Sequence, residues 1–215
     1  MIIKFTNYCK LIKKKSVLSN INLTLKSGKI YGLHGRNGSG KTMLLRAVCG
    51  LILPTSGAVF VDDKQIGKDI EFPDSIGVII DHMTMNSELN GFDNLKALAK
   101  IKKTATSDDI CNAMIAVGLD PKDKKKVKAY SLGMKQKLNI AQALMENPRL
   151  LLLDEPTNAL DSETIEKVRE LFIKKKKEGS LIVIASHNKE DLEILCDEII
   201  EIDQGEIKNQ IKFQL

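Results

Sequence analysis

Residues 35–42 read GRNGSGKT and match G-x-x-x-x-G-K-[ST], a pattern that binds nucleotide phosphates. They follow the apolar stretch KIYGL and lead into an apolar helical pattern, which is the strand-and-helix setting that such a loop needs. Lys41 can reach the β- and γ-phosphates, and Thr42 can offer its hydroxyl to Mg²⁺. The residues expected to contact nucleotide are Gly35, Arg36, Asn37, Gly38, Ser39, Gly40, Lys41 and Thr42. Alone, this loop does not separate a kinase, a GTPase and an ATPase.

Two adjacent carboxylates follow a second apolar stretch, LLLLDEP at 150–156. Asp154 suits a magnesium ligand beside Thr42, directly or through a water. Glu155 is one residue further out and suits a general base acting on the attacking water. A kinase keeps its γ-phosphate from water, so a base at this place favours hydrolysis. The competing interpretation, a pair of solvated acids at a strand end, does not explain the buried strand ahead of them.

A third apolar stretch, LIVIAS, ends at His187. In open α/β sheets the chemistry gathers at the carboxyl ends of the strands, so we expect His187 to lie near the two carboxylates. A histidine there fits a γ-phosphate sensor. A further stretch, YSLGMKQKL at 130–138, has Ser131 at what looks like a helix start, a place that binds phosphate.

These pieces, in this order, resemble the ATP-binding subunit of ABC transporters over nearly the whole chain. GRNGSGKT resembles the Walker A motif, YSLGMKQKL the family signature and LLLLDEP the Walker B motif. NALD at 158–161 resembles the D-loop, and ASH at 185–187 the switch histidine. The resemblance implies a single domain over 1–215 with an α/β, RecA-like P-loop NTPase core. It also implies an antiparallel β subdomain near the N-terminus and an inserted helical subdomain at about 86–145 that carries the signature.

The resemblance further implies ATP and Mg²⁺ as ligands, a second ATP-binding subunit as partner and a separate membrane permease. In this family two subunits stack head to tail, and the signature of one closes over the ATP bound by the other. Ser131 and Gly133 are therefore expected to meet the γ-phosphate of the partner's ATP, and Asp161 of the D-loop is placed among the nucleotide-binding residues.

Three positions depart from the family pattern. The signature has Leu132 and Met134 where LSGGQ has glycine and glutamine, and SLGMKQ resembles a branch of exporters for peptide antibiotics and similar compounds. Asp81 follows IGVII where the Q-loop glutamine is expected, and it is taken as a third magnesium ligand. The adenine-stacking aromatic aligns with Leu11 or Ile12, while Tyr8 lies too early. We therefore expect weak discrimination between ATP and GTP.

The composition and the lack of long apolar runs indicate where in the cell such a chain is located. The 215 residues include no apolar run near the roughly 18 needed to span a bilayer, and the start has no apolar signal-peptide region. The net charge is +5, but no aromatic residues interleave with the lysine runs, so solvated faces are favoured over nucleic-acid binding. The four cysteines form no CxxC pair and predict neither zinc nor disulfides. We expect a cytoplasmic chain held at the inner membrane face by the permease, without inserting directly.

The coarse order of elements fits this interpretation. The first seventy or so residues are rich in strand patterns, with a hairpin turn at Asp62-Asp63. Helical patterns follow, one with Ser107 as N-cap and Gly118 as its end, and after Pro148 strands and helices alternate.

Two other functions stay open at this point. One is an ABC ATPase that works on DNA or ribosomes, although such proteins usually carry a long coiled coil or two ATPase units. The other is a P-loop kinase or a non-hydrolysing nucleotide-binding module, which Glu155, His187 and the signature disfavour. The leading interpretation is the ATPase subunit of an exporter, with the cargo chosen by the permease.

Overall fold

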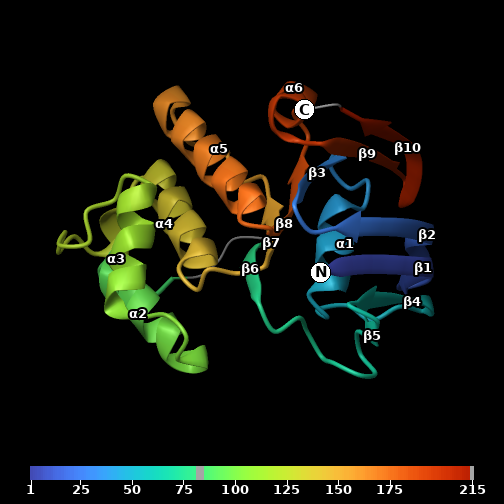
Figure 1. Cartoon of the computed structure of the whole chain (residues 1–215), viewed down its shortest axis with the longest axis horizontal. Coiled ribbons are helices and arrows are strands. Elements are labelled where there is room, and N and C mark those ends of the chain that lie inside the picture. The colour runs from blue at the N-terminus through green and yellow to red at the C-terminus, as the bar shows by residue number, and fades with distance from the viewer. Residues whose placement is uncertain (81–84, 214–215) are drawn as a thin grey trace.

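The computed structural model describes residues 1–80 and 85–213, in which two β-sheets and two groups of helices are layered (Figure 1). The larger sheet has the strand order β10-β9-β3-β8-β7-β6, with β10 antiparallel at one edge and the others parallel. Its strands are β3 Lys29–His34, β6 Ile76–Ile79, β7 Leu150–Asp154, β8 Leu181–Ser186, β9 Glu198–Asp203 and β10 Glu206–Lys212. The central strands β7 and β8 are apolar runs because both their faces are covered.

The smaller sheet is antiparallel, with the order β2-β1-β4-β5. Its strands are β1 Ile2–Ile12, β2 Lys15–Lys26, β4 Ser56–Val61 and β5 Lys64–Gln65. The predicted turn at Asp62 and Asp63 joins β4 to β5, and both residues have positive φ, 47° and 65°. Two successive left-handed residues match the twist of a tight hairpin, which explains the choice of aspartates.

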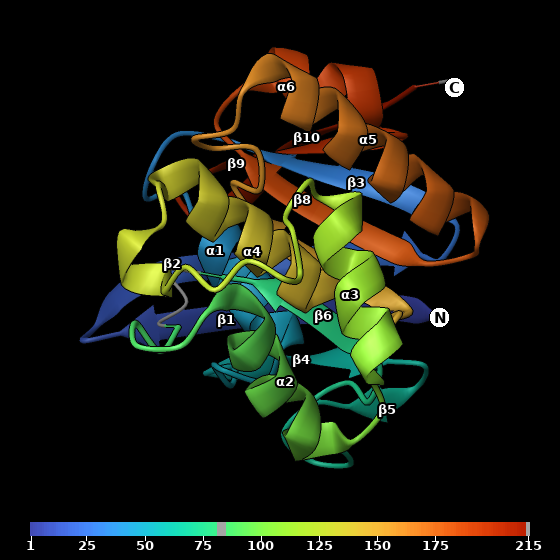
Figure 2. The ribbon, with the colours of Figure 1, turned by 90° about the vertical axis from the view of Figure 1, so that its left-hand side faces the viewer.

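In the described part of the chain, three helices pack on the larger sheet, and three more, with a short 3₁₀ turn, form a helical layer at one end that meets the sheet through α4. The first group is α1 Lys41–Val48, α5 Ser162–Lys177 and α6 Lys189–Leu195. The second group is α2 Gly91–Lys102, α3 Ser107–Ala116, the 3₁₀ turn Val127–Ala129 and α4 Leu132–Leu144. Figure 2 turns this second group toward the viewer, with the sheets behind it. Among the residues described, no helix combines the length and apolar character that crossing a bilayer requires.

The expected N-cap of α3 was wrong by one residue. Thr106 is the cap: its hydroxyl accepts from the backbone N–H of Asp109, and the Asp109 carboxylate accepts from the backbone N–H of Thr106. This reciprocal pair satisfies two free donors at once, whereas Ser107 lies inside the first turn. Gly118, with φ 74°, ends the helix as expected.

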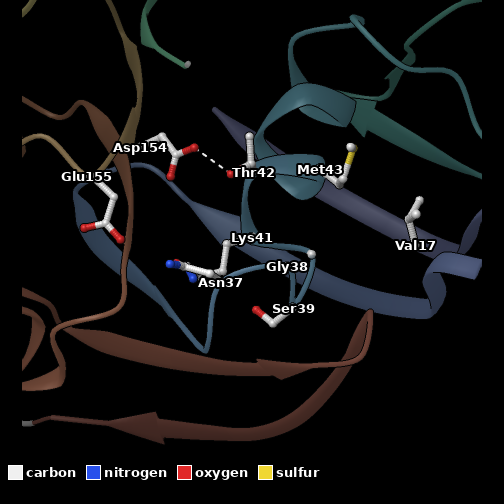
Figure 3. Close-up of a pocket in the computed structure, with 10 residues that line it drawn as sticks. Val17, Asn37, Gly38, Ser39, Lys41, Thr42, Met43, Asp154 and Glu155 are labelled. Carbon is white, nitrogen blue, oxygen red and sulfur yellow. Dashed lines mark hydrogen bonds between the residues drawn. The ribbon is translucent and has the colours of Figure 1, made fainter. Parts of the chain in front are cut away.

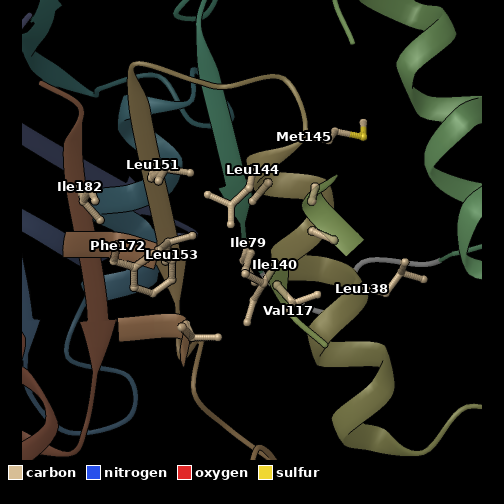
Figure 4. Packing of buried hydrophobic residues seen from close by; sticks show 14 of the residues in the cluster. Ile79, Val117, Leu138, Ile140, Leu144, Met145, Leu151, Leu153, Phe172 and Ile182 are labelled. Atoms are coloured by element: carbon tan, nitrogen blue, oxygen red, sulfur yellow. The ribbon is translucent and has the colours of Figure 1, made fainter. Parts of the chain in front are cut away.

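The larger sheet divides the interior into two cores because alternate residues of a strand point to opposite faces. On β7, Leu151 and Leu153 enter the core shared with α4 and α5, while Leu150 and Leu152 enter the core shared with α1 and the smaller sheet. Figure 4 shows the first core, in which Leu151 and Leu153 lie between Phe172 of α5 and Ile140 and Leu144 of α4. Through α4 the helical layer thus shares a core with β7, the strand that ends at Asp154.

Candidate active site

The phosphate loop connects β3 to α1 and borders a hollow of about 460 Å³. We call this hollow the nucleotide pocket (Figure 3); its lining is Val17, Asn37, Gly38, Ser39, Gly40, Lys41, Thr42, Met43, Asp154 and Glu155. Gly38 and Gly40 have φ of 79° and 115°, which residues with a β-carbon rarely adopt. Gly35 is needed for space, since a β-carbon there would lie 2.2 Å from the carbonyl oxygen of Ile202.

Lys41 is buried at the base of the loop. Its Nζ donates to the carbonyl oxygens of Gly35 at 2.5 Å and Arg36 at 3.2 Å. Burial lowers the pKa of Lys41, and the nearby carboxylates of Glu155 and Asp154 partly oppose that shift. An ammonium group in this position can exchange carbonyl acceptors for phosphate oxygens.

Thr42 and Asp154, two expected magnesium ligands, lie side by side. The Thr42 hydroxyl donates to Asp154 Oδ2 at 2.6 Å, which ties the start of α1 to the end of β7 (Figure 3). No cluster of three or more metal-ligating side chains occurs among the described residues. A hydroxyl and one carboxylate fit Mg²⁺, which is commonly held by one or two carboxylates together with phosphate oxygens. The third expected ligand, Asp81, lies outside the described residues.

Glu155 is held by several contacts at once. Its backbone has φ 47°, a left-handed conformation, and its N–H donates to the carbonyl oxygen of Ala185 at 2.8 Å. Its carboxylate accepts from the Ser186 hydroxyl at 3.1 Å and from the His187 backbone N–H at 2.9 Å. His187 Nδ1 lies 2.7 Å from Glu155 Oε1. Because β7 and β8 are adjacent and parallel, their carboxyl ends bring these groups together.

Ser131, Gly133 and Asp161 lie elsewhere, and none lines the nucleotide pocket of its own chain. Ser131 is the N-cap of α4, and its hydroxyl accepts from the backbone N–H of Met134 at 3.2 Å. Gly133 faces the D-loop, where an added β-carbon would lie 2.8 Å from the carbonyl oxygen of Ala159. Asp161 is the N-cap of α5 and accepts from the backbone N–H and hydroxyl of Thr164. Those hydrogen bonds lower the pKa of Asp161.

Tyr8 is unavailable for stacking on a base. Its side chain is fully buried, 5.5 Å from the Phe5 ring in an edge-to-face pair, and its hydroxyl donates to the carbonyl oxygen of Ile52. Burial raises the pKa of Tyr8 to about 12. Leu11, at the aligned position, is half exposed.

Two residues that contact Glu155 were not predicted from the sequence. Gln136, inside the signature stretch, donates to the carbonyl oxygens of Glu155 and Pro156, and Ser186 donates to the Glu155 carboxylate. Both residues stand inside the motifs named above, but a residue type in a motif does not predict a hydrogen bond to a residue far away in the sequence.

The sequence profile of the family described as "ABC transporter" matches residues 18–158. The chain belongs to this family. The ABC transporter ATP-binding protein YybJ of Bacillus subtilis is 49% identical over 98% of this chain and 97% of its own length. The lantibiotic transport ATP-binding protein SrtF of Streptococcus pyogenes is 37% identical over 96% of this chain and 89% of its own. The bacitracin transport ATP-binding protein BcrA of Bacillus licheniformis is 38% identical over 99% of this chain and 70% of its own.

Solved ABC cassettes have the same fold. The dimeric structure of MJ0796, a bacterial ABC transporter cassette, superposes with a TM-score of 0.89 at 26% identity, with 99% of both chains covered. The same cassette in a post-hydrolysis state bound to ADP and Pi gives a TM-score of 0.88 at 25% identity, also over 99% of both chains. The expected fold class is thereby confirmed, and so is the family to which the motifs pointed. This ABC ATP-binding subunit is an ATPase.

Proposed function

We propose that this ABC ATPase pairs head to tail with a second ATP-binding subunit and drives export through a separate permease. The observation that carries the proposal is the arrangement at one sheet edge: Lys41, Thr42 and Asp154 around the pocket, with the Glu155 carboxylate fixed beside His187. The place of action is the cytoplasmic face of the membrane, where the permease holds the subunit.

In this proposal each residue has one task. Lys41 binds the β- and γ-phosphate oxygens, and the loop N–H groups surround the phosphates. Thr42 and Asp154 would hold Mg²⁺, which neutralises charge on the phosphates when bound. Glu155 accepts a proton from the water that attacks the γ-phosphate. His187, with Nδ1–H directed at the Glu155 carboxylate, donates Nε2–H to the γ-phosphate in its imidazolium form.

The second subunit is needed because Ser131 and Gly133 lie outside their own pocket. The N-terminal end of α4, which Ser131 caps, carries a partial positive charge, which suits a phosphate supplied by another chain. Two ATP molecules between two subunits then hold the dimer closed, and loss of phosphate after hydrolysis opens it.

The proposed cargo is a peptide antibiotic, a drug or a similar compound. It is supported by SrtF and BcrA, which are named for lantibiotic and bacitracin transport, and by the SLGMKQ form of the signature. The cargo contacts the permease, so the proposal does not assign cargo-binding residues to this chain.

The test is to purify the tagged chain from the membranes of its own cells and to identify what accompanies it. We expect a membrane protein with several spanning segments to co-purify, together with ATPase activity. A parallel purification from cells with the untagged chain controls for adhesion to the resin. Recovery with ribosomes or DNA in place of a membrane protein would contradict the transport role.

A further inference from the structure

Gln136 connects the signature helix to the turn that carries the candidate base. It lies in the second turn of α4, and its Nε2 donates to the carbonyl oxygen of Pro156 at 2.9 Å and to that of Glu155 at 3.3 Å. A side-chain amide has two N–H donors, so it can serve both carbonyls at once. Asn139 Nδ2 donates to Gln136 Oε1 at 3.5 Å, so the oxygen of the same amide has a partner of its own. We call residues Glu155 and Pro156 the catalytic turn.

The catalytic turn needs support because Glu155 has a left-handed backbone. A non-glycine residue keeps this conformation only where its surroundings hold it there. The Glu155 N–H is bonded to Ala185 of β8, and its carbonyl oxygen is bonded to Gln136 of α4. The peptide groups on the two sides of the Glu155 Cα are therefore fixed by different elements, one in the sheet and one in the helical layer.

Two further contacts join α4 to the same segment. Gly133 approaches the D-loop so closely that a β-carbon would lie 2.8 Å from the Ala159 carbonyl oxygen. Lys137 Nζ lies 4.0 Å from Asp161 Oδ2. The first two turns of α4 therefore approach the segment from Glu155 to Asp161 at three places, through Gly133, Gln136 and Lys137.

We propose that Gln136 is a positioning residue for Glu155, which holds the catalytic turn in the geometry that hydrolysis requires. This inference rests on the proposed function, in which Glu155 is the general base. It adds a link between the two sites of the dimer: Ser131 at the start of α4 meets the partner's ATP, and Gln136 on the same helix sets the base for the subunit's own ATP.

The test compares Gln136→Glu and Gln136→Ala with Gln142→Ala, which removes a glutamine further along the same helix. Gln136→Glu keeps the size of the side chain but loses both N–H donors and faces two carbonyl oxygens with a carboxylate. We expect kcat to fall about 10- to 100-fold in the Gln136 variants, the size of loss that follows a misplacement of roughly 1 Å.

The dissociation constant of Mg-ATP should stay within about twofold, because Gln136 does not line the nucleotide pocket. Gln142→Ala should leave kcat near that of the wild type.

A double-mutant cycle with Glu155→Gln separates positioning from a general structural role. If Gln136 acts through the base, Gln136→Glu should cause no further loss of single-turnover rate once Glu155 is replaced. Additive losses would overturn the inference, as would wild-type kcat in both Gln136 variants while Glu155→Gln is inactive. Unfolding of both Gln136 variants, seen as a collapse of the melting temperature, would also overturn it in favour of a stabilising role. If the proposed function itself were wrong, the result would differ from all of these, because Glu155→Gln would then hydrolyse ATP at the wild-type rate.

Discussion

Glu155 Oε1 and His187 Nδ1 lie 2.7 Å apart, at the carboxyl ends of the adjacent parallel strands β7 and β8. A carboxylate only accepts hydrogen bonds, so Nδ1 carries the hydrogen and Nε2 is left for another partner. The His187 backbone N–H donates to the same oxygen at 2.9 Å. One residue therefore orients the candidate base through its backbone and its ring, and Nε2 can donate to a phosphate oxygen when the ring carries both hydrogens.

Replacing Glu155 with glutamine should separate binding from hydrolysis. The amide keeps the size of the side chain but cannot take a proton from water, and loss of a positioned base costs about 10²–10⁴ in rate. We expect Glu155→Gln to bind ATP like the wild type, to turn over almost none and to accumulate as an ATP-bound dimer. Steady-state ATPase rates and size-exclusion chromatography with ATP measure this. Hydrolysis near the wild-type rate would show that Glu155 is not the base.

Ser186 should affect the rate of hydrolysis through its hydrogen bond to the Glu155 carboxylate. It is buried, it donates to Glu155 Oε2 at 3.1 Å, and its oxygen accepts from the backbone N–H of Asn188 at 3.1 Å. A hydrogen bond to a charged group contributes about 1.5–3 kcal/mol, so Ser186→Ala should lower kcat by roughly tenfold or more without weakening ATP binding. Ser186→Thr retains the hydroxyl and should restore most of the rate. Equal losses in both variants would point to packing and not to the hydrogen bond.

Nucleotide choice should be weak. Tyr8 is buried in the core, and the aligned position carries Leu11 or Ile12, so no aromatic ring is expected on the base from these residues. Aromatic stacking contributes about 0.5–1.5 kcal/mol, and its absence should leave the dissociation constants of ATP and GTP within a few-fold of each other. Titrations of both nucleotides at the same Mg²⁺ concentration give the comparison. A strong preference for ATP would mean that another group reads the base.

Lys41 and Ser131 should fail in different ways. Lys41 lines the nucleotide pocket, so Lys41→Ala should lose ATP binding even in the monomer. Ser131 lies outside that pocket, so Ser131→Arg should bind Mg-ATP as a monomer and yet fail to dimerise or hydrolyse. Equilibrium binding and dimerisation assays on each variant distinguish the two defects. Loss of monomer binding in Ser131→Arg would refute contact with the partner's ATP.

Mixing the two variants sharpens that comparison. Pairing Lys41→Ala with Ser131→Arg places both lesions at one interfacial site and leaves the other site with an intact phosphate loop and an intact signature. If the sites act singly, the mixture should recover part of the activity that neither variant has alone. The control is Lys41→Ala alone, at the same total protein concentration as the mixture.

The sequence by itself determined the features that depend on neighbouring residues. The phosphate loop, the aspartate turn at Asp62-Asp63 and the buried runs of β7 and β8 were predicted because each depends on local backbone preference or on burial of an apolar strand. The order of the motifs then indicated the family, which the comparisons confirmed. The error at Thr106 was a choice between two adjacent hydroxyl residues, either of which can cap a helix.

The motifs predicted that Asp154 lies beside Thr42, and the structure places them 2.6 Å apart although they are 112 residues apart in sequence. Only the tertiary structure decided the other contacts between distant side chains. The left-handed Glu155 and its contacts with Gln136 and Ser186 depend on where α4 and β8 pack against β7. Tyr8 shows the same limit, since its place in the sequence does not say which face of β1 is buried. Long-range packing decides which face is buried and which side chains meet, because the partners of a side chain depend on many contacts and not on its residue type alone.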